Sequence, residues 1–216
     1  MSTIASQSAQ LLLEIKAIRL NPGNPFTWAS GLRSPIYCDN RILLSYPKIR
    51  DFIKKALADK TKAFREFDVI AGVATAGIAH GALLADALEK PFVYVRSKAK
   101  AHGRQNMIEG ELQEGARVLV VEDLISTGMS SLAACDALQE AGADIVGVLA
   151  IFTYGFDISK QRFSDRKIPL DTLTNYRNLI YEALEKNYIS EKEKYILQDW
   201  NKDPKKWDEE YKLKID

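Results

Sequence analysis

The chain has 216 residues, of which 30 are Lys or Arg and 29 are Asp or Glu, so its net charge is +1. This balance excludes a global field that would attract nucleic acid or anionic lipid, and any polyanion would have to be bound locally. Two cysteines, Cys38 and Cys135, are too few for a disulfide framework and lack a zinc spacing. No stretch approaches the ~20 apolar residues of a membrane span, and a signal-peptide pattern is absent, so we expect a cytoplasmic protein.

The apolar spacing predicts strands and helices in alternation. Helical periodicity covers residues 4–20 and 47–64. Two aromatic, strand-like runs in residues 26–41 flank Ser30-Gly31 and predict a β-hairpin. Further strands are expected at 68–73, 91–96, 118–121, 144–152 and 169–173, with helices at 78–88, 132–141 and 175–185. This alternation predicts an α/β fold with a central parallel sheet flanked by helices and ligands at the carboxyl ends of the strands.

Two regions differ in composition from this alternation. Residues 97–114 contain several basic side chains and few apolar ones, which predicts a long mobile loop. Residues 188–216 are rich in Lys, Glu and Asp. We expect one or two helices there, docked on the rest of the chain by Tyr195, Ile196, Trp200 and Trp207.

The most informative stretch is residues 118–131, which read V-L-V-V-E-D-L-I-S-T-G-M-S-S. Four apolar residues predict a central strand, and Glu122 and Asp123 follow where this strand should end. A small, hydroxyl-rich loop at 126–130 then leads into a helix, and Gly128 allows it a positive φ. Backbone N–H groups at the start of a helix favour an anion, so we expect this loop to bind a phosphate.

Two carboxylates beside a phosphate would repel it, unless they hold neutral hydroxyl groups of the same ligand. Carboxylates accept short, charge-assisted hydrogen bonds from both hydroxyls of a vicinal diol. The predicted ligand is therefore a ribose 5-phosphate. A second small-residue loop, 72–77, also follows a predicted strand and could offer N–H groups to an anion. Close packing of a helix on the sheet would explain its small residues equally well.

Three motifs carry a resemblance to a known family. Residues 120–128, V-V-E-D-L-I-S-T-G, resemble the phosphoribosyl-diphosphate motif of type I phosphoribosyltransferases. Residues 30–37, S-G-L-R-S-P-I-Y, are similar to the N-terminal hood of orotate phosphoribosyltransferases, and Arg96, Lys100 and His102 match their R-x-x-x-K-x-H pattern. The resemblance covers about residues 4–187. It implies a phosphoribosyltransferase domain at 1–187, with a small hood at about 1–45, and a charged helical C-terminal extension at 188–216.

The resemblance implies transfer of the phosphoribosyl group of phosphoribosyl diphosphate to orotate, giving orotidine 5′-monophosphate and diphosphate in pyrimidine (UMP) biosynthesis. The implied cofactor is Mg²⁺, held mainly by the substrate diphosphate, as hard cations with few protein ligands often are. The implied assembly is a homodimer in which the mobile loop 97–114 acts across the interface. Nucleic acid and membrane partners are not expected.

Site residues are carried over residue by residue. Lys100, His102 and Asp123 are the implied catalytic groups; Asp123 would orient the ribose, and the two loop residues would handle the diphosphate. Orotate would contact Ser126, Tyr37 and Arg33. Phosphoribosyl diphosphate would be bound by Arg96, Lys100, His102, Glu122, Asp123, Leu124, Ile125, Ser126, Thr127, Gly128, Met129 and Ser130.

The chain departs from many family members at three positions. Ala29, Ala76 and Phe152 stand where those members carry Lys, Lys and Arg, so the partner of the orotate carboxylate stays open. Two other functions share the central motif. A purine phosphoribosyltransferase usually lacks this hood and loop, and a non-catalytic phosphoribosyl-diphosphate sensor acting on nucleic acid should carry a basic face. The third alternative is a purely structural α/β domain without catalysis. It would require three independent features of an anion site to occur together by chance.

Overall fold

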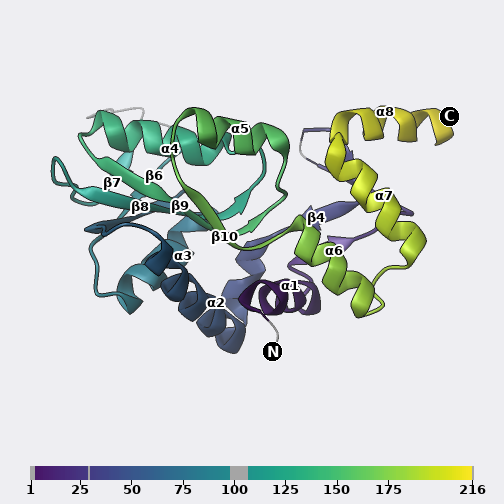
Figure 1. Ribbon diagram of the computed structural model, residues 1–216, viewed down its shortest axis with the longest axis horizontal. Helices are drawn as coiled ribbons and strands as arrows, with labels where there is room; N and C mark the ends of the chain where they lie inside the picture. Colours follow the sequence, from purple (N-terminus) through teal and green to yellow (C-terminus); the bar gives the residue numbers. More distant parts are fainter. Residues whose placement is uncertain (1–2, 29, 98–106, 216) are drawn as a thin grey trace. The chain divides into compact units, whose positions relative to one another are not determined.

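The computed structural model describes residues 3–28, 30–97 and 107–215 (Figure 1). The chain forms two compact units: Leu44–Leu173 is one, and Met1–Leu43 together with Thr174–Asp216 is the other. These units do not follow the predicted boundary at residue 187. The residues after 187 pack with the N-terminal segment, so the C-terminal extension shares a unit with the hood.

A six-stranded sheet organises the unit Leu44–Leu173. Its strands lie in the order β10 (Leu170–Asn175), β9 (Asp144–Thr153), β8 (Arg117–Ile125), β5 (Val69–Val73), β6 (Phe92–Val95) and β7 (Ile108–Glu109). The pairs β8/β9, β5/β8 and β5/β6 are parallel, and β6/β7 is antiparallel. The predicted central parallel sheet flanked by helices is confirmed, and the structure adds β7 as an antiparallel edge strand.

The sheet is covered on both faces, which explains why its central strands read as continuous apolar runs. All of β5 is buried, as are the positions of β9 from Ile145 to Phe152. Helices α2 (Pro47–Lys60) and α3 (Ala76–Ala87) cover one face, and α4 (Met129–Glu140) and α5 (Asp157–Asp165) cover the other (Figure 1). Short 3-10 helices at Asn40–Ser45 and Thr61–Ala63 flank α2.

The N-terminal segment differs from the prediction. Helix α1 (Ile4–Glu14) ends six residues early, and Lys16 with a φ of 58° lies just beyond its end. The strand β1 (Ile18–Leu20) follows and pairs with β4 (Ile36–Cys38). Apolar residues at 15 and 18 fit either pattern, so spacing alone did not separate helix from strand. The predicted hairpin is confirmed, with β2 (Phe26–Thr27) paired antiparallel to β3 (Arg33–Ser34).

The end of the chain forms α6 (Tyr176–Glu185), α7 (Glu191–Lys202) and α8 (Pro204–Ile215). Helix α7 begins with a capping box of Ser190 and Glu193. Trp200 is completely buried, with its ring 5.8 Å from that of Trp28 and 5.6 Å from that of Tyr176. The predicted docking of this tail through Trp200 is confirmed, whereas docking through Tyr195 is wrong, because 61% of Tyr195 is exposed.

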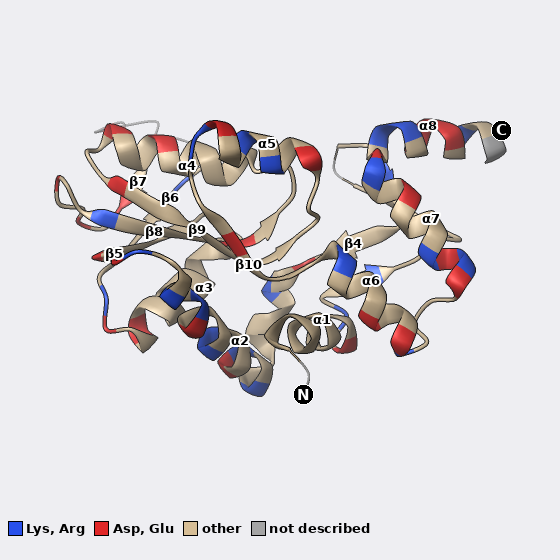
Figure 2. Ribbon diagram, viewed as in Figure 1, with Lys and Arg blue, Asp and Glu red and all other residues tan. Residues whose placement is uncertain are grey.

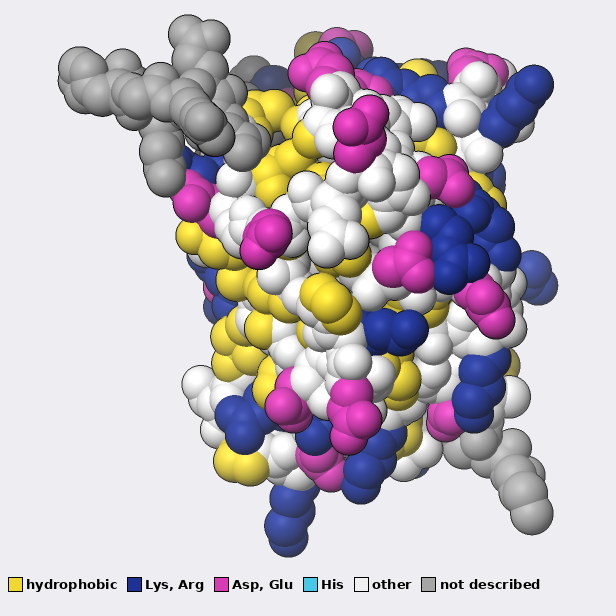
Figure 3. Space-filling view, turned by 90° about the vertical axis from the view of Figure 1, so that its left-hand side faces the viewer, with side chains coloured by type: hydrophobic (Ala, Val, Ile, Leu, Met, Phe, Trp, Pro, Cys, Tyr) yellow, Lys and Arg dark blue, Asp and Glu magenta, His cyan; other side chains and the backbone are white. Residues whose placement is uncertain are grey.

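Charges of both signs are mixed along the outer helices, for example on α5, α7 and α8 (Figure 2). The face in Figure 3 likewise carries basic and acidic side chains next to one another. This distribution agrees with the near-zero net charge and gives that face no extended field of one sign. Within the described ranges, every helix is too short or too polar to cross a bilayer.

We expect Trp200→Ala to lower the free energy of unfolding by about 3–5 kcal/mol, because it removes a fully buried aromatic side chain and leaves a cavity. Tyr195→Ala is the matched control on the same helix, and we expect a change within about 0.5 kcal/mol because Tyr195 is mostly exposed. Urea unfolding followed by circular dichroism measures both. Equal losses for the two variants would contradict this account of the packing.

Candidate active site

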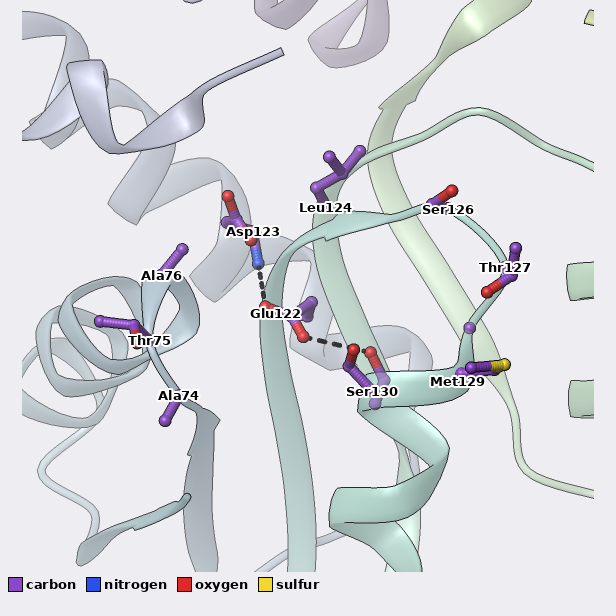
Figure 4. A pocket seen from close by; sticks show the side chains of 12 residues that line it. Ala74, Thr75, Ala76, Glu122, Asp123, Leu124, Ser126, Thr127, Met129 and Ser130 are labelled. Atoms are coloured by element: carbon purple, nitrogen blue, oxygen red, sulfur yellow. Dashed lines mark hydrogen bonds between the residues drawn. The ribbon is translucent and has the colours of Figure 1, made fainter. Parts of the chain in front are cut away.

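A cavity of about 240 Å³ opens where β5 and β8 end (Figure 4). One wall is the segment 74–76 between β5 and α3, and the opposite wall is the loop between β8 and α4. The side chains of Glu122 and Asp123 lie between the two walls. The full lining consists of Ala74, Thr75, Ala76, Glu122, Asp123, Leu124, Ser126, Thr127, Gly128, Met129, Ser130 and Ser131. Both predicted anion loops and the acid pair therefore meet in one place.

Close packing of α3 against β8 brings the two walls together. A Cβ atom on Gly77 would lie 2.6 Å from the carbonyl oxygen of Val121 and 3.3 Å from the Cα of Glu122. A Cβ on Gly72 would lie 2.9 Å from the carbonyl oxygen of Gly77. The small residues of 72–77 thus serve helix packing, while Ala74, Thr75 and Ala76 still line the cavity. The packing explanation for this loop is confirmed, and anion binding by its backbone N–H groups stays a prediction.

The two carboxylates have different surroundings. Glu122 is 6% exposed; its Oε1 accepts the Asp123 backbone N–H at 3.1 Å, and its Oε2 accepts the Ser131 hydroxyl at 3.3 Å. Burial, and secondly the charge of Asp123, raise the pKa of Glu122 well above its ordinary value. Asp123 is only half-buried. Asp123 is therefore the more accessible carboxylate of the pair, and burial disfavours the ionised form of Glu122.

The loop after β8 adopts the conformation that its glycine suggested. Gly128 has a φ of 78° and precedes the first residue of α4. Ser126, Thr127, Met129 and Ser130 line the cavity with it. Ile125 does not, because its side chain is 1% exposed and belongs to the hydrophobic core.

The predicted diphosphate-handling residues lie on another strand. Arg96 directly follows β6 and its guanidinium is 3.4 Å from a carboxylate oxygen of Glu109 on β7. Because β6 runs parallel to β5, Arg96 follows a strand end at the same edge of the sheet as the cavity, although it is not among the lining residues. Lys100 and His102 lie outside the described residues.

The two hood residues predicted to contact orotate belong to the other unit. Tyr37 lies on β4 opposite Arg19, whose guanidinium is 4.9 Å from the centre of the tyrosine ring. Arg33 is engaged by α8: its backbone N–H donates to Asp208 at 3.2 Å, and its Nε is 3.6 Å from the same carboxylate oxygen. Neither residue lines the cavity.

Three contributors to the site were missed by sequence reasoning about individual residues. Thr75 and Ser131 line the cavity, and both lie inside stretches that the sequence had marked, so a wider reading of the motifs would have included them. Arg162 donates to the carbonyl oxygen of Thr127 at 3.0 Å. It lies 35 residues further along the chain, and nothing in the local spacing pointed to it.

A mostly parallel sheet, two small-residue loops at strand ends and an acid pair between them are typical of proteins that bind phosphorylated ribose. A family model described as a phosphoribosyl transferase domain matches residues 40–185. The orotate phosphoribosyltransferase of Listeria monocytogenes is 56% identical over 206 residues, which cover 95% of this chain and 99% of that protein. The chain belongs to the orotate phosphoribosyltransferase family.

Solved structures agree with this assignment. The orotate phosphoribosyltransferase of Aeropyrum pernix has a TM-score of 0.73 at 26% identity, covering 84% of this chain and 99% of that one. The UMP synthase of Leishmania donovani has a TM-score of 0.78 at 25% identity; the match covers 91% of this chain and 42% of that longer one. Most of the chain thus shares its fold with these two proteins.

We expect Glu122→Gln to make the protein more stable than the wild type at about pH 8 and to lose this advantage as the pH falls toward the ordinary glutamate pKa of 4.5. The folded protein holds the Glu122 proton more tightly than the unfolded chain does, so ionisation costs stability as the pH rises above that value. Urea unfolding between about pH 5 and pH 8 measures the difference.

Asp144→Asn provides the control for this experiment. The hydrogen bond from Arg65 lowers the pKa of Asp144, so its ionised form is favoured in the folded protein and its removal should bring no gain at pH 8. A less stable Glu122→Gln protein at pH 8 would contradict the assigned protonation of the acid pair.

Proposed function

We propose that the protein transfers the phosphoribosyl group of phosphoribosyl diphosphate to orotate, yielding orotidine 5′-monophosphate and diphosphate in pyrimidine biosynthesis. One observation carries the proposal: Glu122, Asp123 and the loop 126–130 line the same cavity. Such a cavity offers acceptors for ribose hydroxyls beside donors for a phosphate. Membership of the family supports orotate as the base, in preference to a purine.

The proposed roles follow from position in the cavity. Asp123, with Glu122 behind it, accepts the ribose hydroxyls, while the loop 126–130 binds the 5′-phosphate at the start of α4. Displacement at C1 of the ribose passes through a state with oxocarbenium character. Catalysis then consists of fixing the incoming nitrogen in line and stabilising the departing diphosphate. Direct displacement of this kind requires no protein nucleophile.

Mg²⁺ is the proposed cofactor. Among the residues that the structure describes, no group of three or more His, Cys, Asp or Glu side chains is arranged to hold a metal ion. The donor chemistry suits Mg²⁺ nevertheless, because this ion commonly binds through one or two carboxylates together with substrate phosphates and water. Asp123 is the accessible carboxylate of the cavity. When bound, Mg²⁺ would neutralise charge on the diphosphate.

The prediction of one long loop over 97–114 is wrong at Ile108–Glu109, which form β7. We further propose that Arg96, Lys100 and His102 stabilise the leaving diphosphate and that the protein works as a homodimer in which the segment 97–114 serves the neighbouring site. The R-x-x-x-K-x-H match supports the first proposal, and the family resemblance supports the second. A cytoplasmic location is proposed on the sequence alone.

An ultraviolet assay tests the reaction. Purified protein is mixed with Mg²⁺, phosphoribosyl diphosphate and orotate, with hypoxanthine, guanine and uracil in parallel. We expect loss of orotate absorbance only when both the donor and Mg²⁺ are present, and chelation by EDTA should abolish it. Turnover of a purine instead of orotate would establish the purine alternative. Binding of phosphoribosyl diphosphate without turnover of any base would favour a sensor.

We expect Lys100→Ala to lower kcat by about 10²-fold, the order of loss when one charge-stabilising donor is removed from a transition state. The melting temperature should stay unchanged, because the sequence around Lys100 contains almost no apolar residues that could contribute to a core. Lys98→Ala is the matched control: it removes the same charge two residues away, at an unspecified (x) position of the R-x-x-x-K-x-H pattern. Equal kcat values for Lys100→Ala and the wild type would refute the role of Lys100.

A further inference from the structure

Helix α5 packs directly behind the loop that lines the phosphate side of the cavity. The guanidinium Nη1 of Arg162 donates to the carbonyl oxygen of Thr127 at 3.0 Å. Phe163 is 3% exposed, and its ring would lie 2.8 Å from a Cβ atom on Gly128. Two consecutive side chains of α5 therefore contact two consecutive residues of the loop. Neither contact belongs to the sequence motif that marks the site.

The hydrogen bond from Arg162 fixes the direction of one peptide group. The peptide bond between Thr127 and Gly128 is trans, so the carbonyl of Thr127 and the N–H of Gly128 point in opposite directions. The carbonyl is held on the side of α5. The N–H of Gly128 is thereby turned away from α5, on a loop whose other side lines the cavity.

The alternative orientation of this peptide would be harmful to anion binding. A flipped peptide would point the carbonyl oxygen of Thr127 toward the cavity, where its partial negative charge would repel a phosphate. Gly128 lacks a side chain and has a φ of 78°, so its own backbone opposes such a flip only weakly. A charge-assisted hydrogen bond from a half-buried guanidinium supplies the missing constraint.

We propose that Arg162 is a positioning residue of the phosphate site, which acts by holding the Thr127–Gly128 peptide with its N–H toward the 5′-phosphate of the ribosyl substrate. The inference deepens the proposed function and rests on it for the identity of the ligand. Arg162 touches the loop and does not itself line the cavity. Its positive charge, one peptide group away from the cavity, also favours a dianion there.

Arg166, the C-cap residue of α5, offers a matched control. Its guanidinium Nη1 donates to the carbonyl oxygen of Leu132 at 3.3 Å and to a carboxylate oxygen of Asp136 at 2.5 Å. Both partners lie within α4, beyond the loop. Replacing Arg166 removes one arginine and one link between α5 and α4, and it leaves the Thr127–Gly128 peptide held.

The test compares Arg162→Met and Arg162→Gln with Arg166→Met by the calorimetric Kd for ribose 5-phosphate and the KM values for phosphoribosyl diphosphate and orotate. We expect both Arg162 variants to raise the Kd and the KM for phosphoribosyl diphosphate about tenfold, the usual size of one hydrogen bond to a charged group. The KM for orotate should stay near the wild-type value. Arg162→Lys should recover part of the affinity, and Arg166→Met should keep the Kd within about twofold, which is less than one such bond contributes.

The outcomes separate this inference from the proposed function. If the Arg162 variants bind ribose 5-phosphate as Arg166→Met does, Arg162 has only a structural role and the inference is overturned. If the wild type turns over no orotate while the Arg162 variants still lose ribose 5-phosphate affinity, the proposed function fails and the positioning role stands. Arg162→Gln gives the result if Arg162→Met does not fold.

Discussion

The close approach of α3 to β8 at Gly77 is the constraint on which the site depends. No side chain fits between Gly77 and the carbonyl oxygen of Val121, so the start of α3 lies against the strand residue that precedes the acid pair. The parallel register of β5 and β8, in which Gly72 pairs with Val121, brings their carboxyl ends to the same level. The two loops must therefore face each other across Glu122 and Asp123, and a cavity between them follows from backbone packing alone.

Glu122 and Asp123 are neighbours at the end of β8, yet their carboxylates have different surroundings. Along a strand, neighbouring side chains point to opposite faces, so Glu122 turns toward Ser131 of α4 and becomes buried while Asp123 keeps access to the cavity. Burial disfavours the charge of Glu122, and its hydrogen bonds tie the end of β8 to α4. The pair thus ties β8 to α4 with one carboxylate, while the other lines the cavity.

The sequence predicted those parts of the fold that depend on local pattern. The apolar runs of β5, β8 and β9 and the glycine at 128 specify strands and a left-handed turn by themselves. Helix α5 was missed because only Ser159 and Phe163 of its residues are buried, too few for a periodic apolar face. The contact of Arg162 with Thr127 could not be predicted either. It depends on how α5 packs against the loop, which the spacing of residues along the chain does not encode.

At Arg33 the family resemblance and the structure point to different partners. The resemblance assigned Arg33 to orotate, yet its backbone and guanidinium both meet Asp208 of α8. Asp208 is 3% exposed, and a carboxylate so buried needs compensating charge, which Arg33 and Lys212 provide. Arg33 therefore links the hairpin to the last helix of the chain. The extension is therefore packed together with the hairpin in one compact unit.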